Sequence, residues 1–197
     1  MSALTVDHAM ASGHEWDGLV RIWEETDAPE GCKVEILEGI VTVAPPPSNA
    51  HNDIAELVHR SLYEVIPKDW GVYQTLGTAV PSRSGLYIPD LAVTPRQVVR
   101  AEPGNHVPAA AAELIVEITS KSNAANDRIK KAAGYAQAGV PLYLLIDGWA
   151  PGGPTITLYG EPFGNVYRVL DAGKFGDHIQ LPEPFGLALD TSEFPDT

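Results

Sequence analysis

The segment Glu113-Leu-Ile-Val-Glu-Ile-Thr119 decides the fold class of this chain. It is an apolar, β-branched run of the length that a buried central strand requires. Residues 123–138 begin with polar side chains, carry apolar residues at helical spacing, and end at Gly139 and Pro141, which predicts a helix. Leu142 to Asp147 then returns as a second buried strand. The order strand, helix, strand predicts a sheet that packs against helices.

More elements are predicted on the amino-terminal side. Apolar residues at helical spacing favour one helix over 15–25 and another that begins at Ser48 or Asn49 and ends before Pro67. Strands are predicted over the apolar runs 33–37, 40–44, 72–80 and 86–94. Glu38-Gly39 separates the first two runs and suggests a tight hairpin.

The carboxyl-terminal part predicts an antiparallel meander. Residues 155–159 and 167–170 are its strands, and 185–189 is a weaker candidate. The expected fold class is therefore α/β (α+β), with a mixed central sheet flanked by helices. A chain of 197 residues, 44% hydrophobic, has room for one sizeable core. We expect a helical arm over 1–30 and a single domain over 31–197.

Composition restricts the compartment. No apolar stretch approaches the roughly 20 residues that cross a bilayer, and residues 1–10 lack a basic start followed by an apolar run. Cys32 is the only cysteine, so an intramolecular disulfide is impossible and a thiolate zinc site would have no second sulfur ligand. These features predict a cytoplasmic protein without a membrane partner.

The net charge opposes a polyanionic partner. The chain has 26 acidic and 13 basic residues, which give a formal net charge of −13. Such a charge repels nucleic acid at long range and weakens the counterion-release contribution to affinity. Metal sites nevertheless need carboxylates, and a bound divalent cation changes the field that a phosphate meets.

Two carboxylates stand within apolar runs. If 86–94 is one strand, alternation places Asp90 on the face of Leu86 and Ala92, and Glu117 similarly shares a face with Ile115. Two such carboxylates from different strands repel each other unless a cation lies between them, and oxygen ligands suit Mg²⁺ or Mn²⁺. On that basis, removal of either charge should relieve repulsion. Alternatively, Asp90 only ends a strand and Glu117 forms a structural ion pair.

The predicted helix carries a stripe of polar side chains. Asp127, Lys131 and Tyr135 follow one another at i,i+4 spacing and so share one face. A solvated ion pair is one interpretation. The other is that the stripe faces Asp90 and Glu117, so that Lys131 brings a positive charge to an attacking water or a phosphate oxygen.

His51 lies at the start of the predicted second helix, after a proline-rich turn. It is either a capping or core-edge histidine or part of an anion site at a helix N-terminus. The sequence contains no His-Glu-x-x-His, no Gly-x-x-x-x-Gly-Lys loop, no Gly-x-Ser-x-Gly elbow and no Gly-x-Gly-x-x-Gly fingerprint. Scattered carboxylates therefore remain the basis for a site.

Around these candidate carboxylates and Lys131, the sequence resembles the Uma family of restriction endonucleases, a branch of the PD-(D/E)XK nuclease superfamily. The matching pieces, in order, are Glu35-Ile-Leu-Glu-Gly39, Pro45-Pro-Pro-Ser-Asn-Ala-His51, Pro89-Asp-Leu-Ala-Val93, Ile115-Val-Glu-Ile-Thr-Ser120, Asp127, Lys131, Tyr135-Ala-Gln-Ala-Gly-Val-Pro141 and Leu145-Ile-Asp147. Their order and spacing cover most of the chain and imply a restriction-endonuclease-like fold.

The resemblance also implies roles. Asp90 and Glu117 become the carboxylates that bind Mg²⁺ or Mn²⁺, with the carbonyl of Ile118 as a further ligand. Lys131 matches the catalytic lysine that the family carries on a helix. The accessory polar positions are Glu35, His51, Asp127 and Tyr135. The implied activity is metal-dependent endonuclease cleavage of DNA, with a homodimer as an expected assembly.

The chain departs from the family pattern at three positions. Thr119 stands where many superfamily nucleases carry lysine, Lys121 replaces a common proline, and Leu144 stands where tryptophan is frequent. The second departure leaves Lys121 and Lys131 as two candidate active-site lysines. Two rival functions stay open, a nuclease-fold binding or assembly module without activity and a hydrolase of small phosphodiesters.

Overall fold

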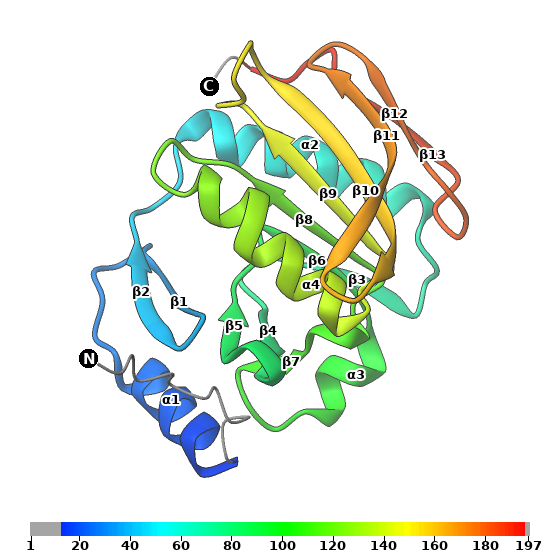
Figure 1. Ribbon diagram of the computed structural model, residues 1–197. Coiled ribbons are helices and arrows are strands. Elements are labelled where there is room, and N and C mark those ends of the chain that lie inside the picture. The colour runs from blue at the N-terminus through cyan, green and yellow to red at the C-terminus, as the bar shows by residue number, and fades with distance from the viewer. Residues whose placement is uncertain (1–12, 196–197) are drawn as a thin grey trace, which may run out of the picture.

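The computed structural model describes residues 13–195 (Figure 1). Its elements, in chain order, are α1 (Gly13–Glu25), β1 (Lys33–Leu37), β2 (Ile40–Ala44), α2 (Asn49–Val65), β3 (Trp70–Tyr73), β4 (Gly77–Val80), η1 (Pro81–Arg83), β5 (Gly85–Tyr87), β6 (Leu91–Pro95), α3 (Arg96–Ala101), β7 (His106–Pro108), η2 (Ala109–Ala111), β8 (Leu114–Ile118), η3 (Asn126–Lys131), α4 (Ala132–Ala138), β9 (Leu142–Asp147), β10 (Thr155–Phe163), β11 (Val166–Lys174), β12 (His178–Leu181) and β13 (Leu187–Asp190). Residues 1–12 of the predicted arm lie outside the described residues.

The larger sheet has six strands in the order β11-β10-β9-β8-β6-β3. β8 and β9 are parallel, whereas the other neighbouring pairs are antiparallel. A parallel pair needs a crossover, and the segment of η3 and α4 supplies it. The predicted strand, helix, strand unit and the first two predicted meander strands therefore belong to this sheet, whereas the weaker candidate 185–189 overlaps β13 (Leu187–Asp190), which lies in a separate sheet. The mixed α+β fold class is confirmed.

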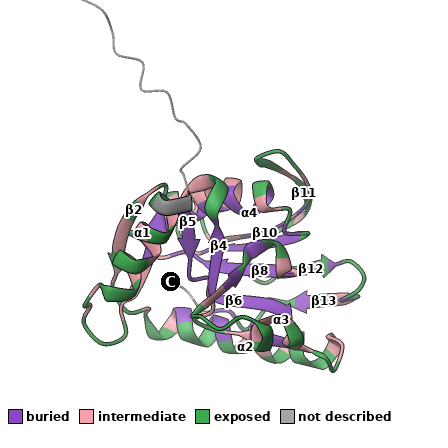
Figure 2. Ribbon diagram, turned by 90° about the horizontal axis from the view of Figure 1, so that it is seen from below, coloured by how far each residue is buried: buried purple, intermediate pink, exposed green. Residues whose placement is uncertain are grey.

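Helices cover both faces of the six-stranded sheet, with α4 in front of it and α2 behind it in Figure 1. Strand alternation explains the two layers. Leu114, Val116 and Ile118 of β8 belong to the core on the α2 side. Ile115 belongs to the core that contains Tyr135 of α4. Figure 2 shows the buried strands between these helices, whose outer faces are exposed.

A second sheet has five strands in the order β2-β1-β5-β4-β7. Ile36 of β1, Leu86 of β5 and Ile88, which follows β5, are buried beneath α1. The indole nitrogen of Trp23 in α1 donates a hydrogen bond to the carbonyl of Val34 at 2.6 Å. The predicted first helix thus packs on this sheet, while β12 and β13 pair as a small third sheet.

The prediction of continuous strands over 72–80 and 86–94 was wrong. Each run is broken, and its two halves belong to different sheets. Thr75 has a φ of 57°, which is left-handed backbone that interrupts a strand. In the second run the break falls at Pro89, which has no N–H to donate to a ladder. At these two breaks the chain passes between the two large sheets.

Several local signals are confirmed. Glu38 and Gly39 have φ values of 50° and 82°, the two positive values that a two-residue hairpin turn requires, and they join β1 to β2. Ser48 caps α2, because its hydroxyl accepts a hydrogen bond from the backbone nitrogen of His51 at 3.2 Å.

The sequence did not predict α3, β7 or β12. No helix in the described part of the chain has the length and apolar character needed to cross a membrane.

Candidate active site

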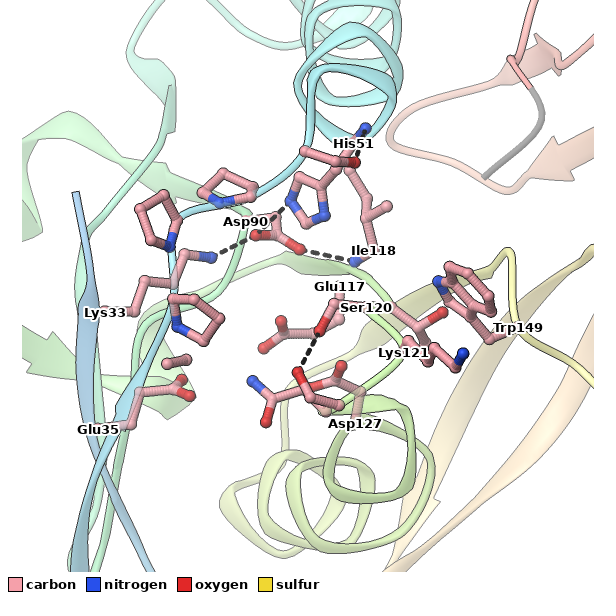
Figure 3. A pocket seen from close by; sticks show the side chains of 18 of the residues that line it. Lys33, Glu35, His51, Asp90, Glu117, Ile118, Ser120, Lys121, Asp127 and Trp149 are labelled. Atoms are coloured by element: carbon pink, nitrogen blue, oxygen red, sulfur yellow. Dashed lines mark hydrogen bonds and ion pairs between the residues drawn. The ribbon is translucent and has the colours of Figure 1, made fainter.

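A pocket of about 500 Å³ lies where the two large sheets meet (Figure 3). It is bordered by β1, the proline-rich loop 44–48, the first turn of α2, the break before β6, segment 117–123 and the helical segment that follows. Two strands and the break before β6 thus contribute acidic residues to the pocket from positions far apart in the sequence. They are Glu35 of β1, Asp90 before β6 and Glu117 of β8.

The sequence predicted Asp90 within a strand over 86–94, and this was wrong. Asp90 lies in the break between β5 and β6. Its carboxylate accepts hydrogen bonds from Nε2 of His51 at 3.0 Å and from the backbone nitrogen of Ile118 at 2.7 Å, and it pairs with the ammonium of Lys33. Burial alone would raise the pKa of Asp90. The His51 hydrogen bond and the Lys33 charge outweigh burial and hold that pKa well below its usual range.

Lys131 is at the centre of a second cluster of charged groups. Its ammonium lies 2.8 Å from Oε1 of Glu35, 3.2 Å from Oε1 of Glu117 and 3.2 Å from Oδ1 of Asp127. The hydroxyl of Tyr135 donates to Oε1 of Glu117 at 3.0 Å. Because Lys131 and Asp127 are buried at 2% and 3% exposure, the solvated ion pair is excluded for this stripe.

Burial and unbalanced charge shift the pKa values of this cluster. Burial raises the pKa of Glu117 well above its usual value, and the charges of Asp127 and Asp90 add to this despite Lys131. Burial likewise raises the pKa of Asp127 to about 6. The pKa of Lys131 is also raised, because its carboxylate neighbours outweigh the effect of burial. All three pKa values are therefore raised in a buried cluster in which several carboxylates share one ammonium.

A π-helical segment, Asn126–Lys131, precedes α4 and carries Asp127 and Lys131 of this cluster. The wider turn changes which backbone groups pair, and the hydroxyl of Tyr143 donates to the carbonyl of Asp127 at 2.9 Å. Such segments are rare and often occur at functional sites. The residue spacing did not predict it.

The structure separates the candidate lysines. Lys130 is 42% exposed in its side chain and pairs with Glu38 at 3.2 Å. Lys121 lies over the ring of Trp149, with its nitrogen 5.7 Å from the ring centroid. Thr119 donates a hydrogen bond to Asp147 at 2.9 Å. Of these positions, only Lys131 contacts Glu117.

The sequence reasoning missed Lys33. Its ammonium pairs with Asp90 and also donates to the carbonyl of Ile88 at 3.4 Å. Glu35 accepts from the backbone nitrogen of Ile88 at 2.7 Å, so both side chains satisfy the backbone at the strand break. A signal was available, because Lys33 and Glu35 stand two residues apart in a predicted strand and therefore share a face.

The donor set fits a divalent cation by charge. Four buried carboxylates, those of Glu35, Asp90, Glu117 and Asp127, face two lysines, Lys33 and Lys131. Burial and then the negative charge of these neighbours raise the pKa of Glu117, and a cation would offset that negative charge. Among residues 13–195, no three His, Cys, Asp or Glu side chains converge closely enough to hold a metal ion. Waters and substrate oxygens would have to complete any coordination.

Comparison with known proteins places the chain among nuclease-like proteins. The Uma2 family, described as "Putative restriction endonuclease", matches residues 19–192. This chain belongs to the Uma2 family. The match confirms the resemblance that the sequence fragments indicated. No curated protein matched the Uma2 chain.

A solved structure supports the fold. It is titled a "putative nuclease belonging to DUF820" from Anabaena variabilis, and it superposes with a TM-score of 0.67 at 18% sequence identity. The match covers 91% of the Uma2 chain and 96% of the other. At this identity the likeness establishes the fold, and the chemistry must be argued from the site.

Proposed function

We propose that this Uma2 chain hydrolyses phosphodiester bonds in nucleic acid with bound Mg²⁺ or Mn²⁺, and that its main substrate is DNA. The observation that supports this most directly is the buried group of Glu117, Asp127 and Glu35 around the Lys131 ammonium, at distances of 2.8 to 3.2 Å, in a pocket that Asp90 also lines. So much buried charge is costly for stability, and a functional site is its simplest explanation.

Asp90 and Glu117 would hold the metal, and the carbonyl of Ile118 would be a further ligand. When bound, the cation supplies the acidity that makes water a nucleophile at neutral pH and offsets charge on the phosphate. His51 and Lys33 orient Asp90 through contacts to one carboxylate oxygen, while Ile118 N–H binds the other.

Lys131 would contribute charge and not accept a proton. Its pKa is raised by the surrounding carboxylates, so it stays protonated at neutral pH. A protonated ammonium beside Glu117 can orient the attacking water or stabilise a phosphate oxygen. Glu35 and Asp127 hold the ammonium from other sides, and Tyr135 fixes Glu117 through its 3.0 Å hydrogen bond.

The test is cleavage of labelled DNA by purified protein with Mn²⁺ or Mg²⁺, with EDTA as the control for metal dependence. Glu117→Gln is the decisive variant, because its loss of charge should leave the protein folded. It should lower turnover by roughly 100-fold or more, whereas Lys130→Met on the exposed face of the helix should retain activity. Equal cleavage by wild type and Glu117→Gln would point to a contaminating nuclease and contradict the proposal.

A second candidate is hydrolysis of small phosphodiesters, which the formal net charge of −13 favours. The same carboxylates and Lys131 would act on such a substrate. Turnover of bis(4-nitrophenyl) phosphate that DNA fragments fail to inhibit would support it. Binding of DNA without any metal-dependent cleavage would instead support the non-catalytic module.

A further inference from the structure

Trp149 presents an unusual aromatic surface at the mouth of the pocket. It follows β9, lines the pocket, and is 40% exposed. An exposed indole has apolar area that water solvates poorly. Figure 3 shows Trp149 beside Lys121 and Ser120, on the side of the pocket away from Lys33 and Glu35.

The backbone of Trp149 is held on both sides. Its nitrogen donates to Oδ1 of Asp147 at 3.1 Å, and its carbonyl accepts from Arg128 at 2.8 Å. Arg128 also grips Asp147 with two hydrogen bonds of 2.6 and 2.8 Å. Thr119 adds a hydrogen bond of 2.9 Å to the same carboxylate. This network therefore fixes the backbone from which the indole projects.

The ammonium group of Lys121 lies over the indole ring of Trp149. The ammonium of Lys121 lies 5.7 Å from the centroid of Trp149, within the range of a cation–π contact. Lys33, Lys121 and Lys131 all line the pocket, but the first and last are paired with carboxylates. Lys121 is exposed and can reach a phosphate.

Charge limits what can bind here. Double-stranded DNA carries about one negative charge per 1.7 Å of axis, and proteins that bind it usually neutralise several phosphates. This chain has a formal net charge of −13. Affinity for a strand must then come partly from a contact that does not depend on charge, and stacking of a base on an aromatic ring is such a contact.

We infer that Trp149 and Lys121 form a binding site for an unpaired nucleotide, with the indole stacked on the base and the ammonium beside a phosphate. The inference rests on the proposed function, since it places the flanking nucleotide next to the carboxylates of Asp90 and Glu117. It makes the substrate a single strand or an unpaired end. DNA and RNA offer the same base and phosphate chemistry, so both are tested.

The experiment is equilibrium binding of the full chain to fluorescein-labelled single strands of about ten nucleotides, a usual site size for such proteins. EDTA prevents cleavage, so the result does not depend on catalysis. The probes are oligothymidylate, oligouridylate, an abasic strand of equal length and a duplex. Trp149→Ala should weaken binding of at least one base-carrying strand on the order of tenfold, with no change for the abasic strand. Trp149→Phe should restore most of the affinity.

The controls separate this contact from folding and from activity. Phe163→Ala removes another aromatic side chain, 84% exposed and outside the pocket lining, and should bind as wild type does. Lys121→Ala should weaken the abasic and base-carrying strands alike. Tighter binding of the duplex than of single strands, or equal binding by wild type and Trp149→Ala, would overturn the inference. Either result would leave metal-dependent cleavage, and so the proposed function, intact.

Discussion

Neutralising the two central carboxylates should change stability in opposite directions. From the sequence, both substitutions would relieve repulsion. The structure instead pairs Asp90 with Lys33 and His51, whereas the pKa of Glu117 is raised by burial and, in addition, by the neighbouring carboxylates. We therefore expect Asp90→Asn to destabilise the metal-free protein and Glu117→Gln to stabilise it.

The magnitudes follow from the contacts. In Asp90→Asn the amide oxygen can still accept from Ile118, but the contacts to Lys33 and His51 are lost. Breaking a buried ion pair costs about 3 to 5 kcal/mol. Because the Lys33 side chain is 21% exposed and can turn to water, we expect about 2 to 3 kcal/mol. Glu117→Gln keeps an acceptor for Lys131 and loses the repulsion, so a gain of about 1 kcal/mol is expected.

Thermal unfolding followed by circular dichroism at pH 7 in EDTA measures both effects. For a protein of this size 1 kcal/mol corresponds to roughly 2–4 °C, so Tm should fall by about 5–10 °C in Asp90→Asn and rise by about 2–4 °C in Glu117→Gln. Glu193→Gln, an exposed residue, is the control and should stay within about 0.5 kcal/mol of wild type. Equal losses of Tm in both site variants would refute the charge assignment.

Three further effects are expected. The pKa of Asp127 rises from its ordinary 3.8 to about 6 on folding, so the folded state binds more protons between these values, and metal-free stability should increase by up to about 3 kcal/mol as pH falls from 7 to about 4. Urea unfolding across this range checks it, and an unchanged pH dependence in Asp127→Asn would contradict it. Lys131→Met, which leaves buried carboxylates unpaired, should cost about 3 to 5 kcal/mol against less than about 1 kcal/mol for Lys130→Met; similar urea midpoints would count against the buried cluster. In Gly134→Ala the new Cβ would lie 2.5 Å from the Tyr87 hydroxyl, so overpacking should lower stability by about 1 to 3 kcal/mol, and a wild-type Tm would show that the two side chains do not crowd.

Local chemistry determined much of this protein. The apolar runs of β8 and β9 and the helix stop at Gly139 predicted two buried strands joined by a helix, as the structure has them. Such signals can be read from the sequence because they depend on residues that are close together in the chain. The Glu38-Gly39 turn placed the first hairpin for the same reason. The i,i+4 spacing put Asp127, Lys131 and Tyr135 on one face before any contact was known.

Other features depended on tertiary structure. The breaks at Thr75 and Pro89 separate two sheets, and their runs look like ordinary strands because pairing partners are chosen over long sequence distances. The same long-range pairing brings Lys33 of β1 against Asp90, 57 residues away in the chain. The sequence could therefore nominate Asp90 and Glu117, but only the packing of the two sheets decided their different surroundings. Asp90 contacts a lysine and a histidine, whereas Glu117 lies near other carboxylates and shares the single ammonium of Lys131 with them.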